Sequence, residues 1–522
     1  MQALELGAWR ERIAAQDASS LRLRLYQALR QAIAAGDLRP GERLPSSRQA
    51  AESLAMARNT VNGAYDLLRA EGCLEIAPGR RPRIRAAIVP DAKVGAKSEA
   101  KSEAKSGAKS GAESGAKSGA KSEAPGGDRR GVARRDDRAG IALSGRGQGL
   151  AHDYRARARA QASGPFSPGE PDPKLFPADA WGRALRRAAR RDYGARAGYR
   201  DPHGLPGLRS ALADQLERHR GVRVAPHRIL ILPTVQSGLV LAATALADPG
   251  DLALVEDPGY AGARAAFAGA GLRLGAMPVD ADGADVAAVM PETPPRLIYV
   301  TPSTQYPTGA RMALHRRMAL LDHARAHQAI ILEDDYDSEF VWRGGEIAAL
   351  QALDDEDRVI GFGTVAKSLL PGLRLAWMVV PDTLVEDLRQ AQRNLGLLAN
   401  LHGQAALQDF LESGEYRAHL RRITRAYGER ARMLVDGLQT VLADQVQILR
   451  PDGGLQVCVP LPDAVEEAAL VAALQARGFA VAGFSGYHLD HGRAGLVIGF
   501  AHAHPAGVAA LCAALEEVMR TS

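Results

Sequence analysis

Apolar residues recur at helical spacing near the start of the chain. Leu25, Leu29 and Ile33 lie four residues apart and form one face of a helix, which is expected to stop at Gly36 and the turn at residues 39–41. A second helix follows at once, because Ser46 and Gln49 have the spacing of a capping box. Its buried face is expected to consist of three residues: Ala50, Ala51 and Leu54.

A third helix is predicted to begin near Arg58. Its apolar residues occupy positions i, i+3, i+4 and i+7: Val61, Ala64, Tyr65 and Leu68. This spacing leaves Arg58, Asn59 and Asn62 facing outward, which suits a recognition helix.

A two-stranded wing is predicted after the third helix. Leu74, Ile76 and Ile84 are its apolar positions, and residues 78–81, Pro-Gly-Arg-Arg, form its tip. Arginines at such a tip can reach phosphates or a minor groove.

The composition changes between residues 88 and 164. The run KSEAKSGAKSGAESGAKSGAKSEA is followed by an Arg-, Asp- and Gly-rich stretch with almost nothing apolar to bury. We therefore predict a disordered linker that joins an N-terminal domain at residues 1–87 to a larger domain at residues 165–522.

Short aliphatic runs alternate with amphipathic helical stretches in the larger domain. The runs are ILIL at 229, LALVE at 252, RLIYV at 296, AIILED at 329 and VIGFG at 359. This alternation is typical of a parallel α/β sheet. Roughly the last hundred residues change to a helix and a smaller mixed segment, which indicates a secondary domain packed on the sheet.

The distribution of charge separates the front of the chain from the back. Residues 1–90 carry a net charge of +5 and residues 91–165 one of +7, whereas the rest of the 522 residues carries −6. A basic front attached to an acidic back indicates that only the front meets a polyanion.

The spacing of the cysteines and the hydropathy of the chain indicate in which cellular compartment the protein is expected. Cys73, Cys458 and Cys512 are far apart and show neither metal-ligand spacing nor a pairing framework, which fits a reducing compartment. No apolar run approaches the roughly 20 residues that span a bilayer, and no signal peptide is recognisable. We expect a soluble, cytoplasmic protein that does not contact membranes.

One lysine of the larger domain stands where α/β sheets bind ligands. Lys367 follows the predicted strand VIGFG, in the loop at its carboxyl end. Asp334 ends another strand, and a carboxylate there can pair with the protonated pyridine nitrogen of pyridoxal 5'-phosphate (PLP). Tyr336, two residues further on, can donate a hydrogen bond to the phenolic oxygen of the same ring.

Further groups fit the remaining edges of that cofactor. Arg374 offers a planar guanidinium to the phosphate, and the turn at residues 234–237, which includes Gln236, opens a helix whose free N–H groups attract the same anion. Tyr260 can stack on the ring, although a lone tyrosine is more often a packing residue.

The stretch GDLRPGERLPSSRQAAESLAMARNTVNGAYDLLRAEGCLE resembles the winged helix-turn-helix of the GntR family, and the match covers nearly all of residues 20–85. The resemblance implies residues that contact DNA and residues at the wing tip: Arg48, Arg58, Asn59 and Thr60, and Gly79 and Arg80. Residues 55–57 are Ala-Met-Ala where the family commonly has Gly-Val-Ser, which removes one hydroxyl that can cap the recognition helix.

Five motifs of the larger domain resemble the fold type I aminotransferases over about 350 residues. They are YRDPHGLPGLR, VEDPGY, YVTPSTQYPTG, EDDYDSEF and GTVAKSLLPGLRLAW. The resemblance implies an α/β fold with a smaller C-terminal subdomain, and it assigns roles to five residues: Lys367 as the Schiff-base lysine, Asp334 and Tyr336 on the ring, Arg374 on the phosphate, and Tyr199 reaching a neighbouring subunit's cofactor.

The two modules in this order, joined by a linker, resemble the MocR family of PLP-dependent transcription regulators. The resemblance implies a head-to-tail homodimer. It also implies that PLP, or an amine or amino-acid effector, changes how the winged helices occupy operator DNA.

Several residues depart from the aminotransferase pattern. Ala366 replaces a serine and Thr234 replaces a glycine of the phosphate cradle, and Thr304 replaces a histidine. Val497 takes the place of the arginine that clamps a substrate carboxylate, so an amino acid loses a bidentate contact. Arg493 is a nearby alternative for that role.

The histidines of the C-terminal segment do not predict a metal centre. His488, His491, His502 and His504 lie close in sequence, but no carboxylate or cysteine is spaced to complete a site.

Three functions remain open at this point. The sequence favours a PLP-dependent DNA-binding regulator. An active amino acid aminotransferase that retains a DNA-binding domain is the alternative, supported by the nearly complete ring-binding set and weakened by Val497. A third possibility is a DNA-binding protein whose large domain serves only as a dimerisation scaffold.

Overall fold

The computed structural model describes an N-terminal module and a larger module. The described residues are 9, 12–14, 21–34, 37–39, 41–70, 74–75, 81–84, 142–151, 164–192, 203–289, 293–343, 348–442, 446, 448, 450–462, 464–490 and 492–521.

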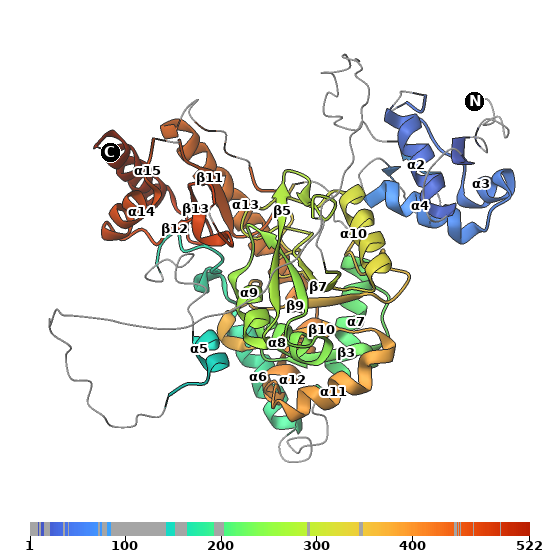
Figure 1. Cartoon of the computed structure of the whole chain (residues 1–522), viewed down its shortest axis with the longest axis horizontal. Helices are drawn as coiled ribbons and strands as arrows, with labels where there is room; N and C mark the ends of the chain where they lie inside the picture. Colours follow the sequence, from blue (N-terminus) through green and yellow to red (C-terminus); the bar gives the residue numbers. More distant parts are fainter. Residues whose placement is uncertain are drawn as a thin grey trace, which may run out of the picture. The chain divides into compact units, whose positions relative to one another are not determined.

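The three predicted helices of the N-terminal module are confirmed (Figure 1). They are α2 (Leu21–Ala34), α3 (Ser47–Leu54) and α4 (Arg58–Ala70). The capping box at the start of α3 is present, since Ser46 Oγ accepts the backbone N–H of Gln49 and the Gln49 side chain accepts that of Ser46. The Tyr65 hydroxyl donates to the carbonyl of Pro45 at 3.0 Å, so α4 is tied to the start of α3.

The apolar faces predicted for α3 and α4 are also confirmed, because every residue assigned to them is buried. Arg58 and Asn59 are exposed at the start of α4 as predicted, whereas Asn62 is half-buried. The wing consists of β1 (Leu74–Glu75) and β2 (Arg83–Ile84), which pair antiparallel with Leu74 opposite Ile84. Ile76 and the predicted tip residues Gly79 and Arg80 lie outside the described residues.

The larger module is built on an eight-stranded sheet in the order β3-β10-β9-β8-β7-β4-β5-β6. Its strands are β3 (Ile229–Leu232), β4 (Leu252–Asp257), β5 (Arg273–Asp280), β6 (Gly283–Ala284), β7 (Pro295–Val300), β8 (Ile330–Asp334), β9 (Val359–Thr364) and β10 (Ala376–Val379). All five strands predicted from aliphatic runs are confirmed.

The direction of the strands corrects one expectation, since the sheet is mixed rather than wholly parallel. Strands β5, β4, β7, β8 and β9 are parallel, but β10 runs antiparallel to both β9 and β3. Only the short 3₁₀ turn η3 (Pro371–Leu373) lies between β9 and β10, and a parallel return needs a crossover of a dozen residues or more.

Helices cover both faces of the sheet (Figure 1). One face, with Leu332, Phe362 and Met378, packs against α8 (Val235–Leu246), α9 (Ala261–Ala270) and α11 (Val385–Asn394). The other, with Ile231 and Trp377, packs against α6 (Ala178–Asp192), α7 (Pro206–Arg220), α12 (Leu401–Glu412) and α13 (Glu415–Leu442). The helix between β7 and β8 is α10 (Leu314–His327).

A smaller C-terminal subdomain follows the long helix α13, as the sequence predicts. It contains the antiparallel sheet β11-β13-β12 and two helices: β11 (Gln456–Pro460), β12 (Ala482–Gly483), β13 (Gly495–Gly499), α14 (Glu467–Ala476) and α15 (Pro505–Thr521). The remaining single turns are η1 (Pro173–Leu175), η2 (Pro226–Arg228), η4 (Asp382–Leu384) and η6 (Ser485–Tyr487).

A short helix lies within the stretch that the sequence assigned to the linker. It is α5 (Gly145–Ala151), and it contacts α9, where Leu150 approaches Gly269. A helix is not expected here from the sequence, because Gly-rich segments have low intrinsic helix propensity.

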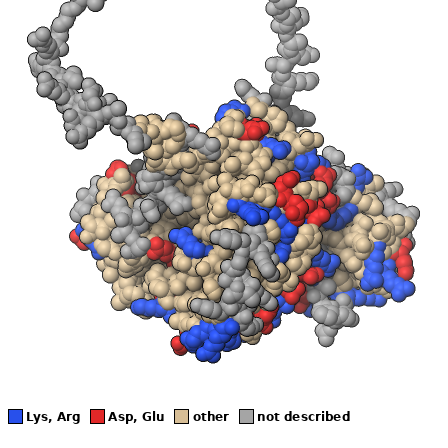
Figure 2. All heavy atoms as spheres, turned by 90° about the horizontal axis from the view of Figure 1, so that it is seen from below, with Lys and Arg blue, Asp and Glu red and all other residues tan. Residues whose placement is uncertain are grey.

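Opposite charges are interspersed over much of the face in Figure 2. Many arginines of the described residues have acidic partners: Arg325 pairs with Asp322, Asp355 and Glu356, and Arg316 pairs with Asp280. Among the described residues, no helix is both long enough and apolar enough to cross a membrane.

Candidate functional site

Lys367 lies in the turn after β9, at the carboxyl edge of the parallel strands. Its Nζ donates to the carbonyl oxygen of Gly169 at 2.6 Å. Gly169 has a φ of +70°, and a Cβ there would lie 3.2 Å from Lys367 Nζ and 3.4 Å from Gln456 Oε1. A glycine therefore allows the segment before η1 to approach the lysine closely.

Asp334 ends β8 and is buried with only half of its carboxylate satisfied. Oδ2 accepts the Tyr299 hydroxyl at 2.7 Å, whereas Oδ1 is buried without a hydrogen-bond partner among the described residues. Burial raises the pKa of Asp334 to about 7, and the hydrogen bond from Tyr299 and the charge of Lys367 oppose that shift. A buried, unpaired carboxylate oxygen costs free energy, so this geometry suits a site that receives a cationic donor.

Tyr306 is the centre of a group of tyrosines beside these residues. Its ring lies 5.7 Å from that of Tyr260, 5.7 Å from that of Tyr336 and 5.6 Å from that of Tyr487, between centroids. Burial, followed by the Asp337 carboxylate, raises the pKa of Tyr336 well above its ordinary value. Tyr336 therefore keeps its proton, and its hydroxyl interacts with the Asp337 carboxylate.

The two groups predicted to hold a phosphate differ in how available they are. Arg374 is exposed with φ +52° after η3, and no hydrogen bond or ion pair of its guanidinium is found among the described residues. At the start of α8, Thr234 forms a capping box with Ser237, in which Thr234 Oγ1 accepts the Ser237 N–H at 3.0 Å. One N–H that a glycine at this position leaves open is therefore already satisfied.

Gln236 and Tyr260 face each other across the first turns of α8 and α9. Gln236 Nε2 donates to the carbonyl of Gly262 at 2.9 Å, and Tyr260 is the N-cap residue of α9. The side chain of Gln236 thus joins the two helices. Tyr199, the remaining predicted cofactor residue, lies outside the described residues.

Val497 is completely buried in an apolar setting. It packs with Ala482 and Tyr487, next to Tyr306, Cys458 and Phe484. Arg493, the alternative clamp, is exposed just before β13 and has no hydrogen-bonding or ionic partner among the described residues. The place assigned to a carboxylate clamp therefore holds no cationic side chain.

The predicted DNA-contacting residues lie on the exposed side of α3 and at the start of α4. Arg48, Arg58 and Asn59 are exposed and Thr60 is half-buried. Arg48 makes only a 3.5 Å contact with Glu52, and both side chains remain largely exposed. Arg81, next to the wing tip, is exposed as well. These side chains are available to a polyanion.

Several residues of the site escaped the sequence analysis: Gly169, Gln456, Tyr299, Tyr487 and Glu256. Glu256 is buried and accepts hydrogen bonds from the Thr301 N–H and hydroxyl, and burial raises its pKa to about 7. Tyr299 opens the motif YVTPSTQYPTG and Glu256 lies in VEDPGY, but the motifs alone assign no role to either residue. Gly169 acts through its carbonyl, which carries no side-chain signal.

Two family models match the chain. The model described as aminotransferase class I and II matches residues 166–515, and the model described as bacterial regulatory proteins, gntR family, matches residues 21–84.

Relatives with both modules match most of the chain. The probable rhizopine catabolism regulatory protein MocR of Rhizobium meliloti is 37% identical over 87% of this chain and 84% of its own length. The HTH-type transcriptional regulator TauR of Rhodobacter capsulatus is 32% identical over 88% of each.

A solved structure resembles the larger module. LysN, an α-aminoadipate aminotransferase from Thermus thermophilus complexed with N-(5'-phosphopyridoxyl)-L-leucine, matches with a TM-score of 0.64 and 28% identity, over 72% of this chain and 98% of LysN.

Proposed function

The chain belongs to the MocR family of transcription regulators, which join a GntR-type DNA-binding domain to an aminotransferase-like domain, and from this premise we propose that PLP bound at Lys367 controls how the winged helices occupy an operator. The observation that carries the proposal is Asp334 Oδ1, a buried carboxylate oxygen without a partner among the described residues, close enough to Lys367 for their charges to interact.

The residues around Asp334 fit PLP. The free oxygen of Asp334 would accept the protonated ring nitrogen, the exposed guanidinium of Arg374 would hold the phosphate, and Tyr260 would cover the ring. When bound, PLP supplies an aldehyde that condenses with amines and a ring that withdraws electrons. The hydrogen bond to Gly169 fixes the Lys367 amine at the edge of the sheet until it reacts.

Retention of an amine effector is favoured over its turnover. An α-amino acid that meets Val497 and Tyr487 finds an apolar wall in place of a guanidinium, so its carboxylate is not held in one orientation. Poor orientation lowers the rate of proton transfer far more than it lowers binding. We propose PLP itself, or an amine or amino acid, as the effector.

The proposal also covers the oligomeric state of the protein and the boundaries of its domains. We propose a head-to-tail homodimer in which Tyr199 reaches the cofactor of the neighbouring subunit. The DNA-binding domain is assigned to residues 1–87, the linker to 88–164 and the PLP domain to 165–522. The DNA-binding domain would bind double-stranded operator DNA.

An active aminotransferase is the second candidate, and the set formed by Lys367, Asp334 and Tyr336 favours it. Ketoacid formation from common amino acids separates the two. Rapid multiple turnover supports the enzyme, whereas a spectral change on amine addition without turnover supports the regulator.

Borohydride reduction tests the lysine directly, because it fixes PLP to the amine with which it has reacted. Full-length protein is incubated with PLP, reduced and digested, and the modified peptide is identified by mass spectrometry. We expect one adduct per chain at Lys367. Lys367→Ala should abolish it, and Lys174→Ala, at the other lysine of the described residues, should leave it unchanged. An adduct that persists in Lys367→Ala contradicts the proposal.

A gel shift on the upstream region of the protein's own gene tests the DNA half. Arg58→Ala should weaken binding at least tenfold, because it removes a charged contact at the start of α4. Arg69→Ala is the matched control, since Arg69 is exposed in the last turn of the same helix. Equal affinities for the two variants would show that the recognition surface is elsewhere.

A further inference from the structure

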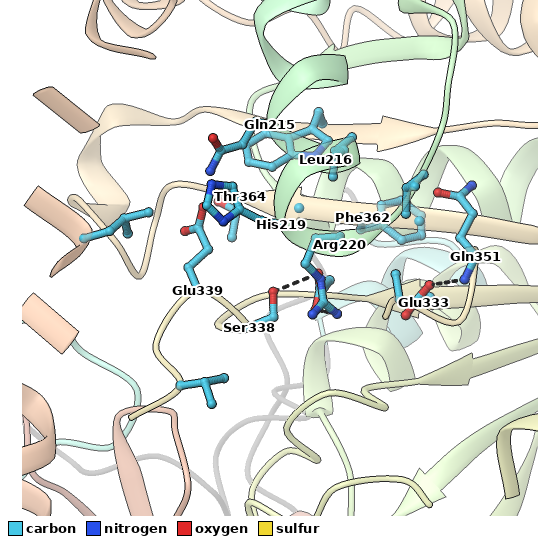
Figure 3. Close-up of a pocket in the computed structure, with 18 of the residues that line it drawn as sticks. Gln215, Leu216, His219, Arg220, Glu333, Ser338, Glu339, Gln351, Phe362 and Thr364 are labelled. Atoms are coloured by element: carbon cyan, nitrogen blue, oxygen red, sulfur yellow. Dashed lines mark hydrogen bonds and ion pairs between the residues drawn. The ribbon is translucent and has the colours of Figure 1, made fainter. Parts of the chain in front are cut away.

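A cavity of about 510 Å³ opens on the face of the sheet opposite to Asp334 (Figure 3). Successive residues of a strand point to opposite faces of the sheet, which separates the cavity from Asp334. Asp334 pairs with Phe362 on the face covered by α8, whereas Glu333 pairs with Gly361 on the face covered by α7 and α13. The volume lies in the range of small-molecule sites. Neither Lys367 nor any other predicted PLP residue lines it.

Two glycines and two tryptophans give the cavity its depth and its apolar walls. Gly361 and Gly363 lie on β9 and present backbone alone. A Cβ on Gly363 would lie 2.4 Å from Trp377, so the indole occupies the space that a side chain at that position would fill. Trp342 also lines the cavity. Such walls suit an aromatic or aliphatic body.

The carboxylates inside the cavity already have partners. Asp335 receives hydrogen bonds from Arg220 at 2.7 and 3.0 Å and from Ser338 at 2.8 Å. Glu333 accepts two backbone N–H groups, those of Leu350 and Gln351. These groups neither attract nor require a cation from outside.

The rim, in contrast, carries three arginines. Arg417, Arg421 and Arg425 line the cavity from α13 at positions i, i+4 and i+8 and therefore form one stripe. All three are exposed, and no acidic partner of theirs is found in the part of the chain that the structure describes. The charged end of a ligand is thus selected at the rim, and it must be an anion.

We propose that this cavity is a second ligand site, separate from the PLP residues, for a small organic anion with an aromatic or aliphatic body. Its body lies in the cavity against the tryptophans, and its carboxylate, sulfonate or phosphate lies on the stripe formed by Arg417, Arg421 and Arg425.

The cavity is also linked to the loop that carries Lys367. Glu339, which lines the cavity beside His219 (Figure 3), accepts the Tyr416 hydroxyl at 2.7 Å. That hydroxyl lies 2.8 Å from Ser368 Oγ, directly after Lys367. A ligand that displaces Glu339 therefore disturbs a hydrogen-bonded chain that ends one residue from the lysine. This regulatory link rests on the proposed function, whereas binding in the cavity does not.

The test uses 8-anilinonaphthalene-1-sulfonate, an aromatic anion whose fluorescence rises in apolar sites, with the full-length protein and no DNA. We expect saturable binding at one site per chain. Arg421→Glu should weaken it at least tenfold, and Thr424→Trp, which fills the cavity from α13, should do the same. Arg432→Glu, an exposed arginine of the same helix outside the cavity, is the control and should bind as the unaltered protein does.

Two outcomes overturn the proposal. Unchanged binding in Arg421→Glu, whose exposed position spares the fold, would show that the stripe does not hold the anion. Displacement of the dye by PLP that occurs in the unaltered protein and is lost in Lys367→Ala would place the site with Lys367 rather than apart from it. Lys367→Ala should keep full dye binding. Dye binding therefore tests the second site, and PLP adduct formation tests the role of Lys367, independently of each other.

The dye also measures the link to Lys367. We expect the rate of PLP adduct formation to change at least twofold when the cavity is saturated with dye, and this change should disappear in Tyr416→Phe, which lacks the hydroxyl between Glu339 and Ser368. An unchanged rate in the unaltered protein would refute the link.

Discussion

The ammonium group of Lys367 donates a 2.6 Å hydrogen bond to the carbonyl oxygen of Gly169, a residue 198 positions earlier in the chain. Gly169 has a left-handed backbone, with φ at +70°. The backbone of a distant segment thus helps to hold the lysine, and the position of the lysine depends on how closely that segment approaches.

Gly169→Ala should slow PLP adduct formation at Lys367 and lower its extent. The added Cβ would lie 3.2 Å from Lys367 Nζ. The backbone at residue 169 is left-handed, and alanine in that conformation lowers the free energy of unfolding by about 1 kcal/mol. Gly250→Ala is the matched control, because Gly250 has a φ of +96° and nothing within 4 Å of its Cβ. Adduct yield from the reduction assay is the measurement. Equal yields for both variants would show that the approach of residue 169 is irrelevant.

Asp334→Asn should weaken PLP binding by roughly tenfold to a hundredfold, which is the value of a charge-assisted hydrogen bond. Asparagine can still accept the Tyr299 hydroxyl, but its amide group would meet the ring nitrogen without a negative charge. The dissociation constant is measured by titrating PLP-free protein and following its absorption. Tyr299→Phe, which leaves the carboxylate in place, should have a smaller effect.

The stability of the PLP-free protein should fall as pH rises from about 4 to 7. Burial raises the pKa of Asp334 to about 7 from an ordinary value of 3.8, so in this window the folded chain holds a proton that the unfolded chain has lost. The loss attributable to Asp334 is on the order of 2 to 4 kcal/mol and is complete above pH 7.

Urea unfolding at several pH values measures this dependence. Asp334→Asn should flatten the slope, and Asp490→Asn, at an exposed position, should not. A slope that is identical in the unaltered protein and Asp334→Asn would contradict the assignment of the titration to Asp334.

Strand-end chemistry could be predicted from the sequence because it depends on local pattern. Aliphatic runs fix where β8 and β9 end, and Asp334 and Lys367 stand at or just beyond those ends. The direction of β10 and the approach of Gly169 could not be predicted in this way. Both depend on how segments far apart in sequence pack together.

The cavity on the face of the sheet opposite to Asp334 could not be predicted from the sequence either. In the sequence, Gly361 and Gly363 read as ordinary strand residues of the run VIGFG. Their consequence appears only in the folded chain, where Trp377 of the neighbouring strand lies against Gly363 and the side chain of Gln351 lies against Gly361. The stripe of arginines on α13 likewise resembles a solvated helix face until the cavity beside it is known.

Ala55→Gly should stabilise the helix-turn-helix. Ala55 follows α3 with φ 53° and ψ 45°, and its N–H bonds the carbonyls of Ala51 and Glu52 as a left-handed C-cap. A left-handed alanine costs about 1 to 2 kcal/mol, and the greater freedom of glycine in the unfolded chain offsets part of the gain, which leaves about 0.5 to 1 kcal/mol. Amide hydrogen exchange of peptides from α3 and α4 in the full-length protein should slow by about threefold. Ala57→Gly, two residues further on and without a positive φ, should accelerate exchange instead. If both variants accelerated it, the left-handed conformation at residue 55 would not be the source of strain.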